Sequence, residues 1–444
     1  MYGGGDDVSA IVLDVGTFST KGGYAGEDSP KAVFPSDIGV VYKNGDDSVV
    51  GISESEIGEK EDIDQVKKTY YTGTNAITYR RPHMEVINPL SDGLIKNWDA
   101  MEQIWNHTFY ERLHINPMDH PILLAEPSFN TRVIREKVSE IMFEKYHTPA
   151  LFISKNAVLS SFSSSKSTSL VLDSGGGMTS ITPVFEGYVV KNGIVKSNLA
   201  GNKLTEEYYK VLSSKNITIN PINLIKKVEI KAGEFSITPY NIPTLTESYK
   251  RYVTLETVRD IKETSCRVAD RDLGEEINIA QVPYELPDGN LLEIGSDRFQ
   301  IPELLFNPAP LNEQLLAASS SAAAALNGTD TTTTNSTPQQ YQGLAKMIIE
   351  SLEKSDTDIR KELISNLILT GGNTLFTGFQ DRLVRDISEI SYNKAKIVSN
   401  QTEKKNSVWI GGSILGSLGT FQQMWMSKSE WEEYGRPLVE KKCP

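Results

Sequence analysis

Two short turns carry the residues whose types and spacing are best suited to chemistry. Each follows an apolar run and begins with an aspartate two residues ahead of a glycine, and the turns read Asp14-Val15-Gly16 and Asp173-Ser174-Gly175. Glycine lets backbone N–H groups approach a phosphate closely, and an aspartate at a strand end could hold Mg²⁺ or Ca²⁺ through water. Both turns are therefore candidate phosphate loops, with Asp14 and Asp173 as candidate metal ligands.

One such turn alone is more typical of an ordinary hairpin. Two further features favour a phosphate site. Lys21 lies one short strand after the first turn and could neutralise phosphate charge, and the pair Gly371-Gly372 follows a third apolar run. The two turns and this glycine pair together favour nucleotide binding over unrelated hairpins.

The elements that must position these turns occur twice. Residues 10–14 and 169–173 are short, branched apolar runs, which are typical of buried strands entering a tight turn. Each run is followed by a second strand-like stretch, at residues 22–26 and 179–187. Two such units indicate a duplicated α/β core with one loop from each lobe, although coincidence of two weak signals stays open.

The remaining periodicity predicts alternating strands and helices. Helical spacing at residues 98–113 and 132–146 flanks an apolar strand at residues 121–126, which predicts a mostly parallel sheet in the first lobe. Later in the chain we expect helices at residues 341–353 and 358–363 and a strand at residues 367–370.

Two stretches interrupt this pattern. Residues 43–81 are polar and acidic, and we expect a small, mobile insertion at the edge of the first lobe. Residues 311–340 are a low-complexity run of alanine, serine and threonine that cannot bury enough surface to offset the cost of ordering. This second stretch is predicted to be a disordered loop.

Composition limits the possible functions. With 444 residues the chain is long enough for two or more cores. Its net charge of −13 argues against general affinity for nucleic acid, so any link to DNA would run through a partner or a local basic patch. The only cysteines are Cys266 and Cys443, which excludes a disulfide framework and a thiolate metal cluster.

Other classes of site and location are also disfavoured. None of the five histidines shows a metal-ligand spacing or sits beside a candidate serine nucleophile. The acidic start lacks a signal peptide, and no apolar run approaches the ~20 residues that span a bilayer. We expect a soluble intracellular protein without membrane association.

Longer segments resemble actin. The stretch from Asp14 to Ser36, which begins Asp-Val-Gly-Thr-Phe-Ser-Thr-Lys-Gly-Gly, is similar to the first phosphate loop of actin and its continuation. Segments beginning at Trp98, Asp173, Tyr284, Ser407 and Phe421, and the Lys-Lys-Cys-Pro end, are similarly actin-like. The resemblance covers nearly the whole chain apart from the two interruptions and a divergent stretch at residues 202–252. The chain is identified as a member of the actin family.

This resemblance implies the fold and its parts. It implies an α/β, actin-like (ribonuclease H-like) duplicated two-lobe fold with four subdomains and a central nucleotide cleft. Its subdomain 1 comprises residues 1–35, 89–163 and 407–444, and subdomain 2 is the small insertion at residues 36–88. Subdomain 3 comprises residues 164–199 and 314–406, and subdomain 4 comprises residues 200–313.

Within the family, several segments resemble the nuclear actin-related protein four class more than actin itself. They are the opening Tyr-Gly-Gly-Gly-Asp-Asp, the stretch from Ile194 to Gly201, Gly371-Gly-Asn-Thr-Leu and the Glu-Lys-Lys-Cys-Pro end. The class implies a nuclear subunit shared by chromatin-remodelling and histone-acetyltransferase complexes, paired with monomeric actin. Contact with histone or DNA would be weak or indirect.

The resemblance also implies the residues of the site, which would bind ATP or ADP with Mg²⁺ or Ca²⁺. The implied cofactor-binding residues belong to both loops, to a pair flanking adenine and ribose, and to other nucleotide-contacting positions: Asp14, Gly16, Thr17, Lys21; Asp173, Ser174, Gly175, Gly177, Met178; Lys262, Glu263; and Gly201, Gly371, Gly372, Phe376, Lys405.

Departures from the family pattern argue against catalysis. Asn156 and Ser180 stand where actin has the glutamine and histidine that order the attacking water. The amide is one methylene shorter, and in-line attack tolerates such misplacement poorly. Gly176 replaces an acid that organises the metal's water shell, and Phe18 replaces a glycine. We expect nucleotide binding with absent or very weak hydrolysis.

The resemblance implies a partner groove as well. Its residues would be Phe162, Ile414, Leu415, Leu418 and Met424, and an apolar groove of this kind accepts an amphipathic helix. The implied ligand is the long helix of a remodeller ATPase or acetyltransferase scaffold, bound next to actin. For Ile414 and Leu418, packing into the core is an equally good explanation. Self-assembly into a filament is not expected, because the interruptions fall where subunits would pack.

Two alternatives of other classes stay open. One is an active ATPase or sugar-kinase-like enzyme that shares the fold, although no convincing base for a substrate hydroxyl is evident. The other is an ATP-hydrolysing, polymerising cytoskeletal relative of actin.

Overall fold

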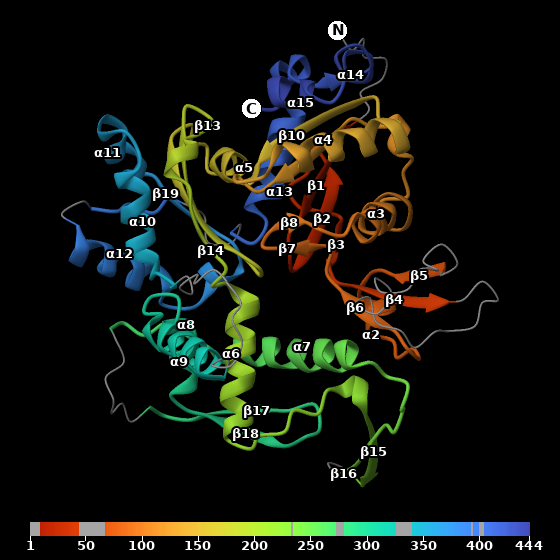
Figure 1. Ribbon diagram of the computed structural model, residues 1–444, viewed down its shortest axis with the longest axis vertical. Coiled ribbons are helices and arrows are strands. Elements are labelled where there is room, and N and C mark those ends of the chain that lie inside the picture. The colour runs from red at the N-terminus through yellow and green to blue at the C-terminus, as the bar shows by residue number, and fades with distance from the viewer. Residues whose placement is uncertain are drawn as a thin grey trace.

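The structure is a computed structural model, and it describes residues 9–43, 67–231, 234–271, 279–325, 340–391, 394–398 and 404–444. Two lobes stand side by side (Figure 1). The first lobe contains a six-stranded sheet in the order β20-β10-β9-β1-β2-β3. These strands are β20 (Met426–Ser427), β10 (Ala150–Lys155), β9 (Ile122–Glu126), β1 (Ile11–Val15), β2 (Ser19–Tyr24) and β3 (Ala32–Pro35).

The first sheet is mixed, so the prediction of a mostly parallel sheet was wrong. Only the centre is parallel, where β1 and β10 both pair with β9. The strands β1, β2 and β3 follow one another through short turns, and such connections force antiparallel pairing. β20 is also antiparallel to its neighbour β10.

Helices cover this sheet, and those at residues 98–112 and 132–145 lie where the apolar periodicity predicts them. They are α3 (Trp98–Asn106) with its π-helical continuation η2 (His107–Arg112), α4 (Arg132–Glu140) with η4 (Ile141–Lys145), α5 (Asn156–Ser163) and α13 (Ser407–Ser417). Side chains of Asn97 and Thr131 cap α3 and α4 by accepting from backbone N–H groups of the first turn. The core of the lobe includes the fully buried Trp105 and Trp409.

The second lobe repeats the design. Its sheet runs β13-β12-β11-β19, with β14 also paired to β12, and comprises β13 (Tyr188–Val189), β12 (Thr179–Phe185), β11 (Ser169–Ser174), β19 (Leu367–Thr370) and β14 (Val195–Ser197). The hairpin β11–β12 and the parallel neighbour β19 correspond to β1–β2 and β9. The helices α10 (Leu344–Glu353), α11 (Thr357–Ser365) and α12 (Phe379–Ile390) pack on it. The predicted α/β, duplicated actin-like fold is confirmed.

Smaller parts extend each lobe below the sheets (Figure 1). In the first lobe they are β4 (Ile38–Lys43), β5 (Lys67–Tyr71), β6 (Glu85–Ile87) and α2 (Thr74–Thr78). The short pair β7 (Leu90–Ser91) and β8 (Leu94–Ile95) also belongs to this lobe. In the second they are α6 (Gly201–Ser214), β15 (Ile225–Lys231), β16 (Glu234–Pro239), α7 (Glu247–Ser265), β17 (Val282–Glu285), β18 (Leu291–Ile294) and α8 (Asp297–Glu303). The chain ends with η8 (Gly419–Gln423), α14 (Lys428–Tyr434) and α15 (Leu438–Lys442).

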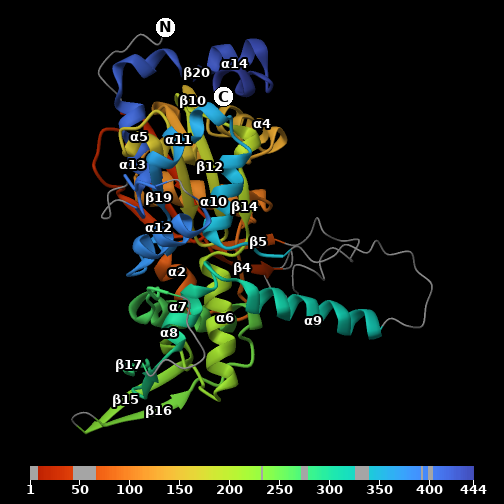
Figure 2. The same cartoon turned by 90° about the vertical axis from the view of Figure 1, so that its left-hand side faces the viewer.

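The two interruptions contain more regular structure than the sequence suggests. Of the first, residues 44–66 lie outside the described part, and the rest contributes β5 and α2. Of the second, residues 326–339 lie outside it, but residues 309–325 form the helix α9 (Ala309–Ala325), which projects from the body (Figure 2). The prediction of a disordered loop was therefore wrong for residues 311–325, because alanine is the best helix former and needs no core for that preference.

No helix in the described ranges combines the length and the apolar character needed to cross a membrane.

Candidate functional site

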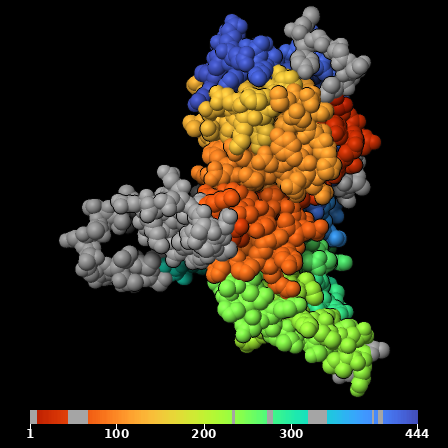
Figure 3. Space-filling model, turned by 90° about the vertical axis from the view of Figure 1, so that its right-hand side faces the viewer, coloured from red at the N-terminus to blue at the C-terminus, as the bar shows by residue number. Residues whose placement is uncertain are grey.

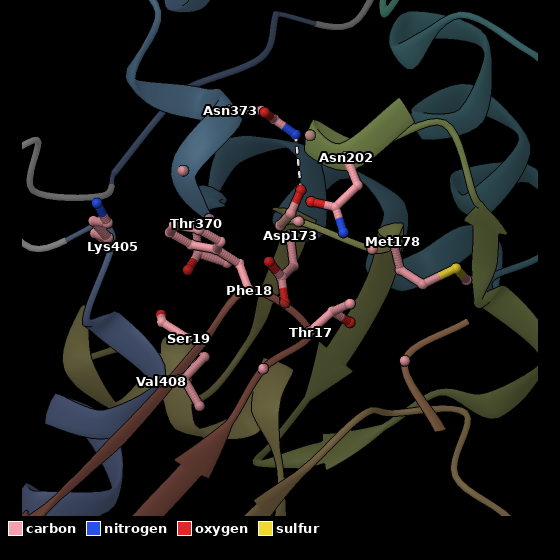
Figure 4. A pocket seen from close by; sticks show the side chains of 18 of the residues that line it. Thr17, Phe18, Ser19, Asp173, Met178, Asn202, Thr370, Asn373, Lys405 and Val408 are labelled. Atoms are coloured by element: carbon pink, nitrogen blue, oxygen red, sulfur yellow. Dashed lines mark hydrogen bonds between the residues drawn. The ribbon is translucent and has the colours of Figure 1, made fainter. Parts of the chain in front are cut away.

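A cleft of about 380 Å³ lies between the lobes, at the ends of the two hairpins. This volume is within the range of small-molecule sites. All the predicted cofactor-binding residues except Ser174 line it, as do Asn156, Ser180, Phe18 and Gly176. Figure 4 shows Thr17 and Phe18 of the first loop close to Asp173 of the second. The structure thus brings residues far apart in the chain to one place.

The first loop is a tight turn between β1 and β2. The Gly16 N–H donates to the Ser19 carbonyl oxygen over 3.1 Å, and the Asn88 amide holds the Thr17 carbonyl oxygen at 2.8 Å. Asp14 faces Lys21 across the hairpin, and the Lys21 ammonium is 2.9 Å from the Asp14 carboxylate. Because the two side chains are only 9% and 15% exposed, this ion pair is largely shielded from solvent.

The second loop is held from below by other parts of its lobe. Its Gly175 carbonyl oxygen accepts from the Gly201 N–H at the start of α6, over 3.0 Å, and from the Asn373 amide, over 2.9 Å. Asn373 also donates to the Ser174 hydroxyl, which is fully buried and pairs with Thr179 at 2.9 Å. The Ser174 hydroxyl therefore supports the loop from beneath, and its role as a cofactor contact stays a prediction.

Sequence reasoning missed several residues that line the cleft. Asn202, Arg259, Thr370 and Asn373 are among them. Asn373 directly follows the glycine pair that was singled out, so its position offered a signal. Arg259 offered none, because a charged residue on a polar helix is usually solvated.

The two loops touch, and glycine is required where they do. A Cβ atom at Gly177 would lie 2.5 Å from the Thr17 hydroxyl, and one at Gly176 would lie 2.8 Å from the Phe18 Cβ. On its other side the Phe18 ring lies 4.4 Å below the Arg259 guanidinium of the second lobe. Phe18 thus fills the space that a side chain at position 176 would need.

A third glycine position supports the close approach of the strand β19 to this loop. Gly371 has φ of +88°, and a Cβ atom there would lie 2.3 Å from the Ser174 carbonyl oxygen. Only glycine combines this backbone conformation with that approach.

Asn156 and Ser180 stand at the positions where the resemblance implies residues that order water. The Asn156 side chain is bonded to other residues of the protein. The Asn156 amide donates to the Asp173 carboxylate over 2.9 Å, and its oxygen accepts from the Ser128 hydroxyl over 3.0 Å. Burial, and after it the charge of the nearby Asp14, raises the pKa of Asp173 to about 6, although Lys21 and Asn156 act in the opposite direction. Ser180 lies in β12 directly across from Asp173 and is buried.

The Lys262 ammonium is likewise bonded to other residues of the protein. Its ammonium donates to the Gly201 carbonyl oxygen over 2.8 Å and to the Thr205 hydroxyl over 2.9 Å, at the start of α6. Burial lowers the pKa of Lys262 to about 8, and the neighbouring Arg259 acts in the same direction. Glu263, Phe376 and Lys405 line the same part of the cleft.

This arrangement fits a nucleotide and a divalent ion. In the described residues, the N–H groups of Phe18, Gly176 and Gly177 have no acceptor, as expected of loops that bind phosphate. Mg²⁺ commonly takes one or two carboxylates together with water and phosphate oxygens. Asp14 and Asp173 offer that donor set, and no described cluster has three or more potential ligands of the His, Cys, Asp or Glu type.

The predicted groove residues divide into two groups. Ile414, Leu418 and Met424 are 39%, 40% and 42% exposed, so the alternative that Ile414 and Leu418 only pack the core was wrong. Phe162 is half-buried against the core of the first lobe. Leu415 is buried within that core, so its role as a groove contact stays a prediction that its burial does not favour.

Two lobes of the same design around a glycine-lined cleft define the class of fold, a duplicated α/β fold with a central cleft. The chain belongs to the actin family: the family model described as Actin matches residues 5–444. Over 461 residues the chain is 45% identical to Actin-related protein 4 of Oryza sativa subsp. indica, with both chains covered completely.

Other relatives carry the same name. The chain is 46% identical to Actin-related protein 4 of Arabidopsis thaliana over 464 residues, again with both chains covered completely. It is 35% identical to Actin-related protein 4 of Yarrowia lipolytica (strain CLIB 122 / E 150) over 450 residues, covering 99% of this chain and 97% of that one. The resemblance to the actin-related protein four class therefore extends along the full chain.

Proposed function

We propose that this protein is a nuclear, ATP-binding actin-related subunit that does not hydrolyse its nucleotide. With monomeric actin it clamps an amphipathic scaffold helix in chromatin-remodelling and histone-acetyltransferase complexes. ATP, held with Mg²⁺ or Ca²⁺ between the loops, stabilises the subunit, because a ligand that binds only the folded state favours that state.

One observation carries the non-catalytic part of this proposal. Both polar ends of the Asn156 side chain are engaged, by Asp173 and by Ser128, and Ser180 cannot reach as an imidazole would. A side chain already bonded at both ends is poorly placed to orient an attacking water.

A single-turnover assay tests this part. Protein loaded with γ-³²P-labelled ATP and Mg²⁺ should retain its label for hours. Release of phosphate within minutes would show instead that the cleft is an active centre.

The groove supports the partner. Ile414, Leu418 and Met424 are exposed apolar side chains in and just after α13, and exposed apolar side chains of this kind suit the apolar face of a helix. Neighbouring actin would bind the rest of the same helix, so the two proteins act side by side.

Binding to the long scaffold helix of a remodeller ATPase, measured with actin present, tests the groove. Ile414→Asp should weaken binding at least tenfold, whereas Val133→Asp should not, since Val133 is an equally apolar but 75% exposed residue on α4. Equal effects of the two variants would place the helix elsewhere.

A further inference from the structure

Positive charge is concentrated in the smaller parts of the two lobes, although the chain as a whole is acidic. Residues 67–87 of the first lobe contain four lysines and arginines and one glutamate, and residues 215–251 of the second contain six and three. Their combined net charge is +6, whereas that of the whole chain is −13. Figure 3 shows these two regions, in orange and green, as one continuous surface. We call the two segments together the cationic end.

Arg80 of the cationic end is oriented without an acidic partner. Its guanidinium carbon lies 3.8 Å from the centre of the Tyr240 ring, and its Nη1 donates to the Asn223 carbonyl oxygen over 3.0 Å. A ring beneath the guanidinium and a carbonyl at one edge fix the plane of the group. Among the described residues no carboxylate pairs with Arg80, and its other side-chain nitrogens have no acceptor.

The neighbouring Arg81 is held in the same way. Its guanidinium carbon lies 3.9 Å from the centre of the Tyr71 ring and 4.9 Å from that of the Tyr79 ring. Its Nη1 donates to the carbonyl oxygens of Ala76 and Tyr79. In the described part of the chain it too lacks a carboxylate partner. Tyr79 is 66% exposed, so this cation lies where a ligand can reach it from solvent.

A third cation extends the pattern into the hairpin of β15 and β16. The Lys227 ammonium lies 4.3 Å from the centre of the Phe235 ring and 3.4 Å from the Pro287 carbonyl oxygen. The adjacent Lys226 is exposed to solvent. This hairpin projects from the body, and no other described strand pairs with it (Figure 2). The cationic end therefore presents its charge on a protruding element as well as beside α2.

Cations fixed in this way are suited to phosphate groups. Arginine presents its N–H donors in a planar fork that matches a phosphate, and a fork held in advance loses less side-chain freedom on binding. Arg80 and Arg81 are also neighbours without a paired carboxylate, so their charges repel each other, and an added anion offsets that repulsion. The rings beneath the cations position charge, so the backbone of a nucleic acid fits this surface better than its bases.

We propose that the cationic end binds the phosphate backbone of duplex DNA. The duplex carries one charge per ~1.7 Å of its axis, and such an extended polyanion matches a surface whose excess charge is spread over both lobes. An acidic peptide would instead fit a single cluster of cations. Contacts to the backbone alone make the binding independent of base sequence. The inference goes beyond the proposed function and does not depend on it, because it requires neither the nucleotide nor the scaffold helix.

Fluorescence anisotropy of a short labelled duplex of random sequence, titrated with the purified full chain, tests the proposal. Arg80→Gln/Arg81→Gln removes the two anchored guanidinium groups. The matched control is Lys346→Gln/Lys361→Gln, which removes the same charge from α10 and α11 of the second lobe. Both control lysines are exposed, and neither forms an ion pair among the described residues.

The unmodified chain should bind with a dissociation constant on the order of 10⁻⁴–10⁻⁶ M at physiological salt. The arginine variant should bind at least about tenfold more weakly, and the control should stay within about 2-fold. The slope of log affinity against log salt should fall by about 2 in the arginine variant and not in the control, since each lost phosphate contact lowers it by about 1. Equal affinities of the two variants would overturn the proposal, and so would a failure of the unmodified chain to bind.

A second variant separates binding from folding, because Arg80 also bonds to a residue of the other lobe. Lys226→Gln/Lys227→Gln alters only the projecting hairpin, so its thermal unfolding midpoint should equal that of the unmodified chain. Its affinity for the duplex should still fall by about 3-fold to 10-fold, with a lower salt slope. Weaker binding confined to the arginine variant, together with a lowered unfolding midpoint, would count against the proposal.

A polyglutamate competitor decides between the two kinds of polyanion. At equal concentration of charges it should displace the duplex poorly, because its charges are less dense than those of DNA. Displacement as effective as that by unlabelled duplex would assign the cationic end to an acidic protein segment and overturn its assignment to DNA.

Discussion

The hairpins β1–β2 and β11–β12 are built alike, yet they surround their aspartates differently. Asp14 faces Lys21 across the first hairpin, and Asp173 faces Ser180 at the equivalent place in the second. The first carboxylate is therefore balanced by a cation of its own lobe. The second accepts a hydrogen bond from the neutral Asn156 amide, and burial disfavours its charged form.

The loops differ in volume as well as in charge. The first carries the bulk of Phe18, and the second has glycine at the facing position 176. Each departure from the family pattern is thus matched by the other. The comparison teaches that the two halves are complementary. The first supplies the Lys21 cation and the Phe18 ring. The second supplies the Asp173 carboxylate and, at Gly176, the space beside Phe18.

Replacing the two aspartates should produce the largest difference between the hairpins. Asp14→Asn leaves the nearly buried Lys21 without its carboxylate, which should cost roughly 3–5 kcal/mol of unfolding free energy. Asp173→Asn removes a buried acid for which the described part of the chain offers no ion-pair partner, and it should be neutral or stabilising. Urea unfolding of nucleotide-free protein at pH 7.5 measures both, and equal losses would mean that the hairpins do not differ in this way.

The pH dependence of stability should show the same contrast. Because the pKa of Asp173 is raised to about 6 in the folded state, the folded chain binds more protons than the unfolded chain between about pH 4 and pH 6. Stability should therefore fall as the pH rises through this window, by up to about 3 kcal/mol.

The variant Asp173→Asn isolates this contribution. Burial raises the pKa of Asp37 to about 6 as well, so only the difference between the unmodified chain and the variant reports on Asp173. Unfolding free energies at pH 4.5 and pH 7 provide it. Parallel pH profiles would show that Asp173 ionises without penalty.

The pairing of Phe18 with Gly176 should appear as a coupling of about 1–2 kcal/mol. Gly176→Ala places a methyl group 2.8 Å from the Phe18 Cβ and should destabilise the chain. In a Phe18→Gly background the same change should be nearly neutral, because the obstacle is gone. A double-mutant cycle on urea unfolding measures the coupling, and additive effects would separate the two departures.

Local pattern was enough to predict much of the fold. The strands that end in Asp14 and Asp173 are continuous apolar runs, and their repetition revealed the duplication, because burial on both faces imposes such runs wherever a strand lies in a core. Local signals located the two loops and the glycine pair of the cleft lining, whereas Lys262, Glu263 and Lys405 came only from the resemblance to actin. Local signals misjudged the sheet pairing and residues 311–325, since one depends on connection length and the other on helix propensity without burial.

Contacts between distant segments could not be predicted. Ser174 is a polar residue of the second loop, but its hydroxyl lies beneath the loop, where it forms hydrogen bonds with Thr179 and Asn373. Leu415 and Leu418 are alike in sequence, and only the packing of α13 separates the buried one from the exposed one.

The smallest expected effect concerns the water-ordering positions, where the second hairpin lacks a base. Asn156→Gln lengthens an amide whose two ends already serve Asp173 and Ser128, and on its own it should change single-turnover phosphate release by less than about 3-fold, because no neighbouring base is gained. Adding Ser180→His introduces an imidazole on the strand opposite Asp173 and should raise release by about tenfold, below the 10²–10⁴ of an evolved general base. Quenched-flow release of labelled phosphate compares the variants. A large gain from Asn156→Gln alone would show that amide length, and not the lack of a base at position 180, limits phosphate release.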